Sequence, residues 1–356
     1  MQIVLHIIIT LLLLPWGGLV MMSPMMFAAP GFQDNKSSVL SSILLLGYPV
    51  IIFAVLKLFN FNYFGIAAGN WLLWSSVIIV IIILISGTPK LLYNIARDIP
   101  NTGYFKTEIS VFLNGKIIPE ATPDTFKTFE DDTRYAIDEN HVYYDGKIIV
   151  GADPTTFQPA KVVAQEEFAL YWKDNQHVYL DGKVLENCDA ATFTSIAHSY
   201  GQDEYQIYYR DKILHGANPR TFYFITDTVG RDDSNLFVFD KKVTESVDLD
   251  TFEIVNHEEG DFCRDRNHVY IICYRLEDPL IKVPGADPNT FLPIGRSYAR
   301  DHSNVYFYGY YKGIKTIAMR LEDVNPDSFS VGYDEATDSE ATDGKKYFMY
   351  GELVRS

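Results

Sequence analysis

Asp153-Pro154-Thr155-Thr156-Phe157 is the stretch that decides the fold, because its pattern returns along the chain. The pattern is a capping residue, two variable residues, a hydroxyl residue and a phenylalanine. Pro follows the capping residue in five of seven copies, and Thr or Ser always precedes the Phe. Such a recurrence predicts a tandem-repeat architecture. The copies begin at Thr122, Asp153, Asp189, Asn218, Asp248, Asp287 and Asn325 and end at Phe126, Phe157, Phe193, Phe222, Phe252, Phe291 and Phe329.

Each copy predicts an N-capped single turn of helix. Asp, Asn and Thr side chains accept hydrogen bonds from the free amides of a first helical turn. Pro suits the first helical position, where no amide is needed. The Phe follows the cap by four residues and faces inward, and burying it contributes roughly 1.5–3 kcal/mol of transfer free energy. We therefore expect the seven Phe residues to form the core.

The sequence between the capped turns predicts short strands and tight turns. Each unit reads as a strand, an Asp-led turn, a strand, a tight turn and a strand before the capped turn. The first unit, at residues 111–118, has no clear preceding strand, and a broken unit at residues 343–354 closes the array. The strongest signals for two-residue hairpins are Asn114-Gly115, Asp145-Gly146 and Asp181-Gly182.

These units predict an all-β tandem-repeat array of about seven repeats over residues 104–356. The spacing from the turn Asp to the Phe is 19 residues in units two to four and grows to 26 and 28 in units six and seven. Insertions are therefore expected in the hairpins of those two units. Units near 30 residues are short for a propeller blade, so an open, solenoid-like array is favoured and a closed propeller is the alternative.

Charge and cysteine content restrict the class of protein. The formal net charge is −16, and residues 1–100 carry +2, which leaves −18 for the rest. An acidic array argues against nucleic-acid binding, which needs a basic face. Three cysteines cannot supply a disulfide framework. Cys263 and Cys273 flank one strand, so a bridge between them and two separate buried thiols both remain open.

Residues 1–89 contain three apolar runs that predict transmembrane helices at about residues 3–22, 39–59 and 70–87. Each run approaches the roughly 20 residues that cross a bilayer. A cleaved signal peptide is the alternative for the first run, but no Lys or Arg precedes it and residues 25–29 are a poor cleavage site. Residues 90–103 then read as a juxtamembrane linker.

The second unit resembles the repeat of the DKNYY family. It reads Asp-x-x-x-Val-Tyr-Tyr-Asp-Gly-Lys, then Gly-Ala-Asp-Pro-x-Thr-Phe, over residues 138–157, and residues 174–193 are similar. The resemblance covers about residues 104–354. It implies a bacterial protein of tandem aromatic repeats behind an N-terminal signal or membrane segment. It carries over no enzymatic activity, and some members look like immunity partners of toxins.

Candidate ligand residues have simpler explanations. His141, His177 and His268 precede Val-Tyr in three repeats, and repeat symmetry spaces them apart, which favours a turn or surface role over a zinc site. The Asp-led turns lack the central Gly and terminal Glu of a calcium loop. No catalytic, cofactor or metal site is expected. A loop with more potential ligands close together also lacks the spacing typical of metal ligands; it contains His257, Glu258, Glu259 and Asp261.

These observations predict a membrane-tethered, non-catalytic repeat module that binds a protein, with a bacterial toxin as one partner class. The acidic array would steer a basic partner towards it. The alternative is a cell-envelope enzyme or glycan-binding protein that uses aromatic and carboxylate residues. Lys36, Lys90 and Arg97 against Lys57 lean towards a cytoplasmic array. The resemblance implies export, so we expect the array on the periplasmic side of a bacterial inner membrane, anchored by several spans.

Overall fold

The computed structural model describes residues 2–28, 32–85, 88–162, 170–197, 199–255, 262–273, 277–295, 297–311 and 314–355. The chain divides into two compact units, Met1–Thr155 and Thr156–Ser356. The first unit holds the helices and the first two sheets of the array, and the second holds the remaining sheets. Each unit is described by itself below.

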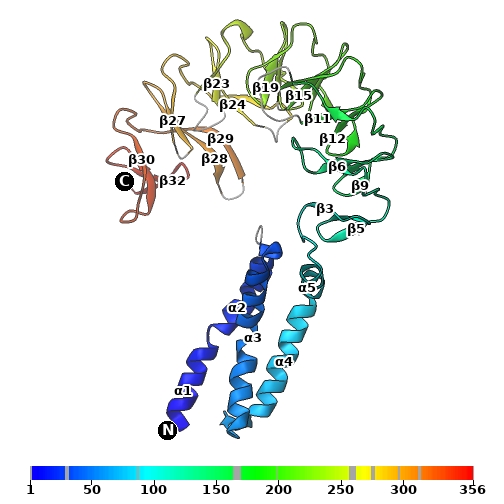
Figure 1. Cartoon of the computed structure of the whole chain (residues 1–356). Helices are drawn as coiled ribbons and strands as arrows, with labels where there is room; N and C mark the ends of the chain where they lie inside the picture. Colours follow the sequence, from blue (N-terminus) through cyan, green and yellow to red (C-terminus); the bar gives the residue numbers. More distant parts are fainter. Residues whose placement is uncertain are drawn as a thin grey trace. The chain divides into compact units, whose positions relative to one another are not determined.

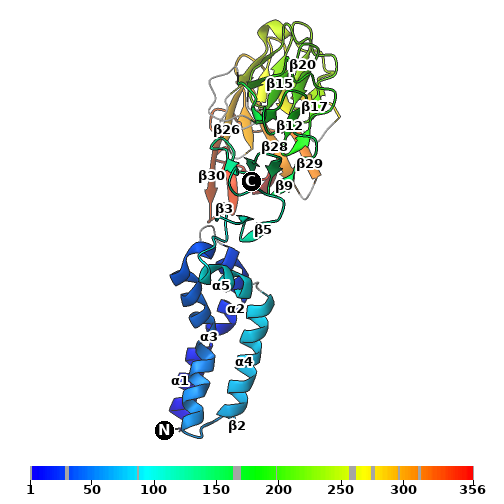
Figure 2. The ribbon, with the colours of Figure 1, turned by 45° about the vertical axis from the view of Figure 1, so that its right-hand side comes forward.

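The helical part of the first unit contains three stretches long and apolar enough to cross a membrane, Ile3–Met22, Lys36–Leu58 and Ala68–Ile85, as the sequence predicted. The first stretch is broken at Pro15, which has no amide to continue a helix. Helices α3 and α4 lie side by side (Figure 2). The elements are α1 (Gln2–Leu13), α2 (Trp16–Ala28), η1 (Phe32–Asp34), α3 (Lys36–Leu58), β1 (Asn62–Tyr63), β2 (Ile66–Ala67), α4 (Ala68–Ile85) and α5 (Thr88–Ala96).

Two segments differ from the sequence-based expectation. Residues 90–103 were expected to be a linker, but α5 extends into them as far as Ala96. The first repeat was expected to lack a preceding strand, and this was wrong. Strand β3 (Tyr104–Lys106) pairs with β4 (Val111–Leu113), which pairs with β5 (Lys116–Ile118). Three residues are too few for an alternation pattern to show in the sequence.

The rest of the array consists of four-stranded antiparallel sheets, in each of which the strand order follows the chain order. Figure 1 shows the sheets of residues 156–356 succeeding one another as an open row. The strands are β6 (Lys127–Thr128), β7 (Tyr135–Ile137), β8 (Val142–Tyr144), β9 (Lys147–Ile148), β10 (Gln158–Pro159), β11 (Tyr171–Lys173), β12 (Val178–Leu180), β13 (Lys183–Val184), β14 (Thr194–Ala197), β15 (Tyr200–Gln202), β16 (Ile207–Tyr209), β17 (Lys212–Ile213), β18 (Tyr223–Phe224), β19 (Val229–Arg231), β20 (Leu236–Val238), β21 (Lys241–Lys242), β22 (Glu253–Val255), β23 (Phe262–Arg264), β24 (Val269–Ile272), β25 (Leu280–Lys282), β26 (Leu292–Gly295), β27 (Tyr298–Arg300), β28 (Val305–Tyr311), β29 (Ile314–Leu321), β30 (Ser330–Asp334), β31 (Ser339–Thr342), β32 (Tyr347–Met349) and β33 (Glu352–Arg355).

The all-β, solenoid-like architecture is therefore confirmed, but each repeat has one more strand than the sequence indicated. The residues that directly follow each Phe form the first strand of a sheet. Gln158 and Pro159, for example, pair with Lys173 and Trp172. The expected insertions lie in the hairpins β24–β25 and β28–β29.

Aromatic side chains make the core of each repeat. Six of the seven repeated Phe residues are buried, and Phe252 is half-buried. The ring of Phe193 lies 6.0 Å from the ring of Tyr208, between centroids, and similar tilted pairs recur along the array. Tilted ring pairs of this kind stabilise the fold by more than the burial of their apolar area alone.

The Phe needs a small residue on the neighbouring strand. A Cβ added to Gly201 would lie 2.4 Å from Cζ of Phe193, and Gly230 stands in the same relation to Phe222. The other repeats place Ala136, Cys263, Ala299 and Ala341 at this strand position, opposite the central aromatic residue of the next strand. Trp172 is the exception, and it stacks on Phe157 with 5.4 Å between centroids.

We predict that Gly201→Ala lowers the free energy of unfolding of the full chain by about 1–3 kcal/mol, the usual penalty for overpacking. Denaturant unfolding of the detergent-solubilised chain measures this. Gly332→Ala is the matched control, because Gly332 also lies in a strand and has no atom within 4 Å of an added Cβ. Equal stability of the two variants would contradict the packing argument.

Candidate functional site

Six of the seven predicted capping residues, all except Thr122, are seen to act as side-chain caps. Each side-chain oxygen accepts a hydrogen bond from the amide two residues later, at 2.9–3.2 Å, as between Asp153 and Thr155. Among the capped turns that the structure describes, only the one after Asp248 is a 3₁₀ helix, η2 (Leu249–Thr251). In four of the other copies the Phe amide donates to the carbonyl of the capping residue four positions earlier, at 3.0–3.1 Å, as in a single turn of α-helix. The remaining caps are Asp189, Asn218, Asp248, Asp287 and Asn325.

A buried Asp, which the sequence marked only as the start of a turn, connects the segments of each unit from the second to the seventh. In Asp265, Oδ1 accepts hydrogen bonds from the amides of Asn267 and His268, both at 2.7 Å. Oδ2 accepts from the amide of the cap Asp248 at 2.9 Å and from the Tyr270 hydroxyl at 2.7 Å. We call this carboxylate with its donors the carboxylate hub.

The hub recurs at equivalent positions of the array. The Asp oxygen and the Tyr hydroxyl are separated by 2.6–2.9 Å in each case. The same carboxylates accept from two amides of their own turn, at 2.7–2.8 Å. The pairs are Asp138–Tyr143, Asp174–Tyr179, Asp203–Tyr208 and Asp301–Tyr306.

Two repeats show that the Tyr hydroxyl can be replaced. Phe237 occupies the Tyr position of the fifth unit, and there Asn235 donates its Nδ2 to both oxygens of Asp232 at 3.1 Å. In the last unit Phe348 takes that position, and Asp343 accepts from the amides of Lys345 and Lys346. What recurs is a carboxylate whose acceptor sites are occupied, as burial requires.

The repeated hydroxyl before each Phe connects the capped turn to the hub turn. Thr192 Oγ1 donates to its own cap, Asp189, at 2.8 Å and accepts from the amide of Glu204 at 3.2 Å. The equivalent acceptance is made by Thr125, Thr156, Thr251 and Thr290. This explains why Thr or Ser occupies that position.

The hub hydrogen bonds set the ionisation of both partners. Burial raises the pKa of Asp265, but bonds from the Asp248 amide, the Tyr270 hydroxyl and the turn amides outweigh it and lower the pKa. The same balance lowers the pKa of Asp138 and Asp301. Burial, together with the adjacent carboxylate, raises the pKa of Tyr270 well above its ordinary value. The hub is therefore an ionised Asp bonded to a neutral Tyr.

Comparisons with known proteins now find a match for the array. Residues 104–242 match the model of the DKNYY family. This part of the chain is similar to the DKNYY family. No curated protein and no solved structure matches the chain. The hub geometry continues past the matched residues, because Asp265–Tyr270 and Asp301–Tyr306 repeat it.

The histidines that precede Val in three repeats of the array do not converge on one site. Nδ1 of His141, His177 and His268 lies 3.8–3.9 Å from Oδ1 of its own hub Asp, which already accepts two amides. In the described residues no three His, Cys, Asp or Glu side chains gather as a metal site. The Asp-led turns at Asp138, Asp232 and Asp301 use their carboxylates for hydrogen bonds. The loop of His257, Glu258, Glu259 and Asp261 lies outside the described residues.

The three cysteines are free thiols, so Cys263 and Cys273 are not bridged. Cys263 occupies the small-residue position of its repeat, opposite the hub residue Tyr270. Cys188 is half-buried, and burial raises the pKa of its thiol to about 12. A thiol with such a pKa is protonated at neutral pH and is a weak nucleophile.

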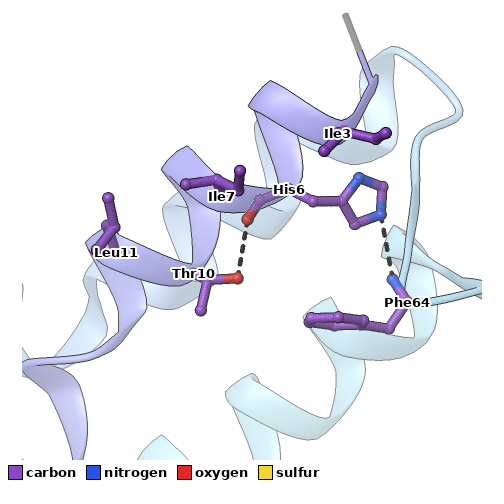
Figure 3. Close-up of a pocket in the computed structure, with 6 residues that line it drawn as sticks. All are labelled: Ile3, His6, Ile7, Thr10, Leu11 and Phe64. Carbon is purple, nitrogen blue, oxygen red and sulfur yellow. Dashed lines mark hydrogen bonds between the residues drawn. The ribbon is translucent and has the colours of Figure 1, made fainter.

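A pocket of about 500 Å³ lies beside α1 (Figure 3). Its lining includes the exposed side chains of Ile3, Ile7 and Leu11. His6 is its one titratable residue, and His6 Nε2 accepts the amide of Phe64 at 3.4 Å. Thr10 donates to the His6 carbonyl at 2.8 Å. A lone imidazole in an apolar groove offers no acid–base pair.

We predict that Asp265→Asn destabilises the full chain by about 1–3 kcal/mol, the cost of an unsatisfied buried group. An amide cannot accept at both of its polar atoms, so Nδ2 would face the Asp248 amide or displace the turn amides. Denaturant unfolding at about pH 7 measures the difference from the parent. Asp233→Asn is the control, because Asp233 is exposed in an equivalent turn.

The same pair of proteins tests the charge. The folded pKa of Asp265 lies below its ordinary 3.8, so its contribution is present above that value and is lost as pH falls through the folded pKa. The difference in free energy of unfolding between the parent and Asp265→Asn should therefore be constant near neutral pH. It should become smaller as the pH falls. A gap that widens below about pH 4 would show that the ionised hub is not the stabilising species.

Proposed function

We propose that the chain is a membrane-tethered, non-catalytic protein whose DKNYY array binds another protein. The observation that carries this proposal is the use of the repeated polar residues. The hub Asp, the cap and the hydroxyl of each repeat bond to one another and to backbone amides. These recurring groups therefore maintain the fold, and the repeat leaves its exposed turns as the variable surface.

Charge gives that surface its selectivity. The chain beyond residue 100 carries a net −18, and acidic residues follow the hub Asp at Glu139, Glu204 and Asp233, all exposed. A line of like charges raises the local concentration of a basic partner and its association rate. A basic bacterial toxin, held by the chain as an immunity partner, is the partner class that the family resemblance suggests.

Membrane tethering rests on the three apolar stretches. We propose that the chain is a multi-pass protein of a bacterial inner membrane. The array is proposed to lie on the periplasmic side, because the family resemblance implies export. The difference of two charges between the loops is too small to fix the opposite, cytoplasmic orientation.

Site-specific photo-crosslinking in cells tests the interaction. Tyr205 is 68 % exposed beside Glu204, and a crosslinker there should yield one discrete adduct with another protein. The yield of the adduct should fall as ionic strength rises above about 0.15 M, because salt screens the attraction between the exposed charges and the partner. A crosslinker at the fully buried Tyr200 is the control and should yield none. Equal yields at the two positions, or none at Tyr205, would contradict the proposal.

An alkaline phosphatase fused after Ser356 tests the orientation. We expect phosphatase activity, since the enzyme folds only after export. A green fluorescent protein fused at the same residue is the control and should be dark. The reverse result would place the array in the cytoplasm and leave the interaction proposal to the crosslinking test.

A further inference from the structure

A second pocket, of about 690 Å³, lies between α5 and the first sheet of the array. Both belong to the first compact unit. Its lining includes Lys90 and Arg97 of the α5 region and Lys116 of β5, and no lining residue is acidic. Three cations in one pocket stand out in a chain of net charge −16.

Specific contacts build this pocket. Asn94, which is buried, donates Nδ2 to the Asn101 side chain at 2.8 Å and to the Gly115 carbonyl at 3.2 Å. Gly115 has φ +65°, and a Cβ there would lie 2.1 Å from Asn94 Nδ2. Only glycine therefore allows α5 and the β4–β5 hairpin to approach so closely. Asp34 of η1 holds the connecting segment through the Asn101 amide and the Thr102 hydroxyl.

The pocket combines charge with exposed apolar surface. Arg97 lies over the Tyr93 ring, with Cζ 5.3 Å from the centroid, and its Nη1 donates to the Tyr93 hydroxyl, so two contacts orient its guanidinium. Ile109 and Ile117 also line the pocket and are 87 % and 56 % exposed. Burial and the nearby Lys116 ammonium lower the pKa of Lys90, so an anion in the pocket would relieve this repulsion.

The place of the pocket, just after the third apolar helix, indicates which kind of anion it binds. The third apolar helix, α4, ends at Ile85, and Lys90 follows five residues later. A basic pocket beside a membrane span, with apolar side chains at its edge, matches a lipid that joins a charged headgroup to acyl chains. A soluble phosphate would use the cations but not the exposed isoleucines.

We propose that this pocket binds the phosphate of an anionic phospholipid through Lys90, Arg97 and Lys116. The proposal rests on the membrane insertion proposed above and does not depend on the array's protein partner. Bound lipid would hold α5 and the first sheet at the membrane surface.

The test uses the full chain in nanodiscs of equal phosphatidylglycerol and phosphatidylcholine. Co-elution with the nanodisc first establishes insertion, so failure of tethering is seen separately. Native mass spectrometry of the released protein then counts retained lipids. We expect phosphatidylglycerol to be retained at least about five-fold over phosphatidylcholine, since one juxtamembrane cation contributes roughly that factor.

The triple variant Lys90→Gln, Arg97→Gln and Lys116→Gln should lose this preference. Lys90→Arg with Lys116→Arg keeps the charges and should retain it, which separates charge from folding. The matched control removes three exposed cations outside the pocket lining, by Lys147→Gln, Lys183→Gln and Arg220→Gln, and should behave as the parent. Equal retention of the two lipids by the inserted parent, or the same preference in the triple variant, would overturn the proposal.

A second arm separates the two sources of phosphate. Radiolabelled inorganic phosphate is added to the chain in nanodiscs of phosphatidylcholine alone. We expect no retention above that of the triple variant. Saturable retention of phosphate by the parent, without a preference for phosphatidylglycerol, would assign the pocket to a soluble anion and overturn the lipid assignment.

Discussion

The array depends on a carboxylate that is buried and fully bonded. Removing a charged group from water is unfavourable unless its hydrogen-bonding sites are filled. Asp265 meets this condition with two amides of its own turn, the amide of the preceding cap and one Tyr hydroxyl. Because these donors come from three segments, one carboxylate holds the turn, the following strand and the capped turn in place relative to one another.

Such a hub suits an array in which most strands have only two to four residues and make few hydrogen bonds to their neighbours. The hub sets the orientation of the Tyr, the Tyr ring packs against the Phe, and the Phe fits over a small residue of the neighbouring strand. Where a repeat has a different residue at one of these positions, another contact compensates for it. Asn235 supplies the donor that Phe237 lacks, and Trp172 replaces a small residue by stacking on Phe157. Cys263 belongs to the same series, as a small core residue and not as half of a bridge.

The first unit joins two environments with opposite charge. Its apolar helices and α5 carry a slight positive balance, whereas the array is strongly acidic. Asn94 and Gly115 dock α5 onto the first hairpin, and this contact brings Lys90 and Lys116 into one pocket. Lipid binding at this junction and protein binding along the array would then use separate surfaces of opposite sign.

The sequence by itself determined what local chemistry repeats: the caps, the Phe core positions, the hairpin turns, the three apolar stretches and the open all-β class. It did not determine the strand after each Phe, strand β3, the docking of α5 or the carboxylate hub. The reason is the kind of partner involved. The hub Asp bonds to the amide of a cap 14 to 17 residues away, as Asp203 does with Asp189 and Asp265 with Asp248, and a backbone amide leaves no mark on residue identity. The Asp-to-Tyr interval of five residues was the one readable signal of the hub. Tertiary structure alone decided that this Asp is buried, and that cations far apart in the chain share a pocket.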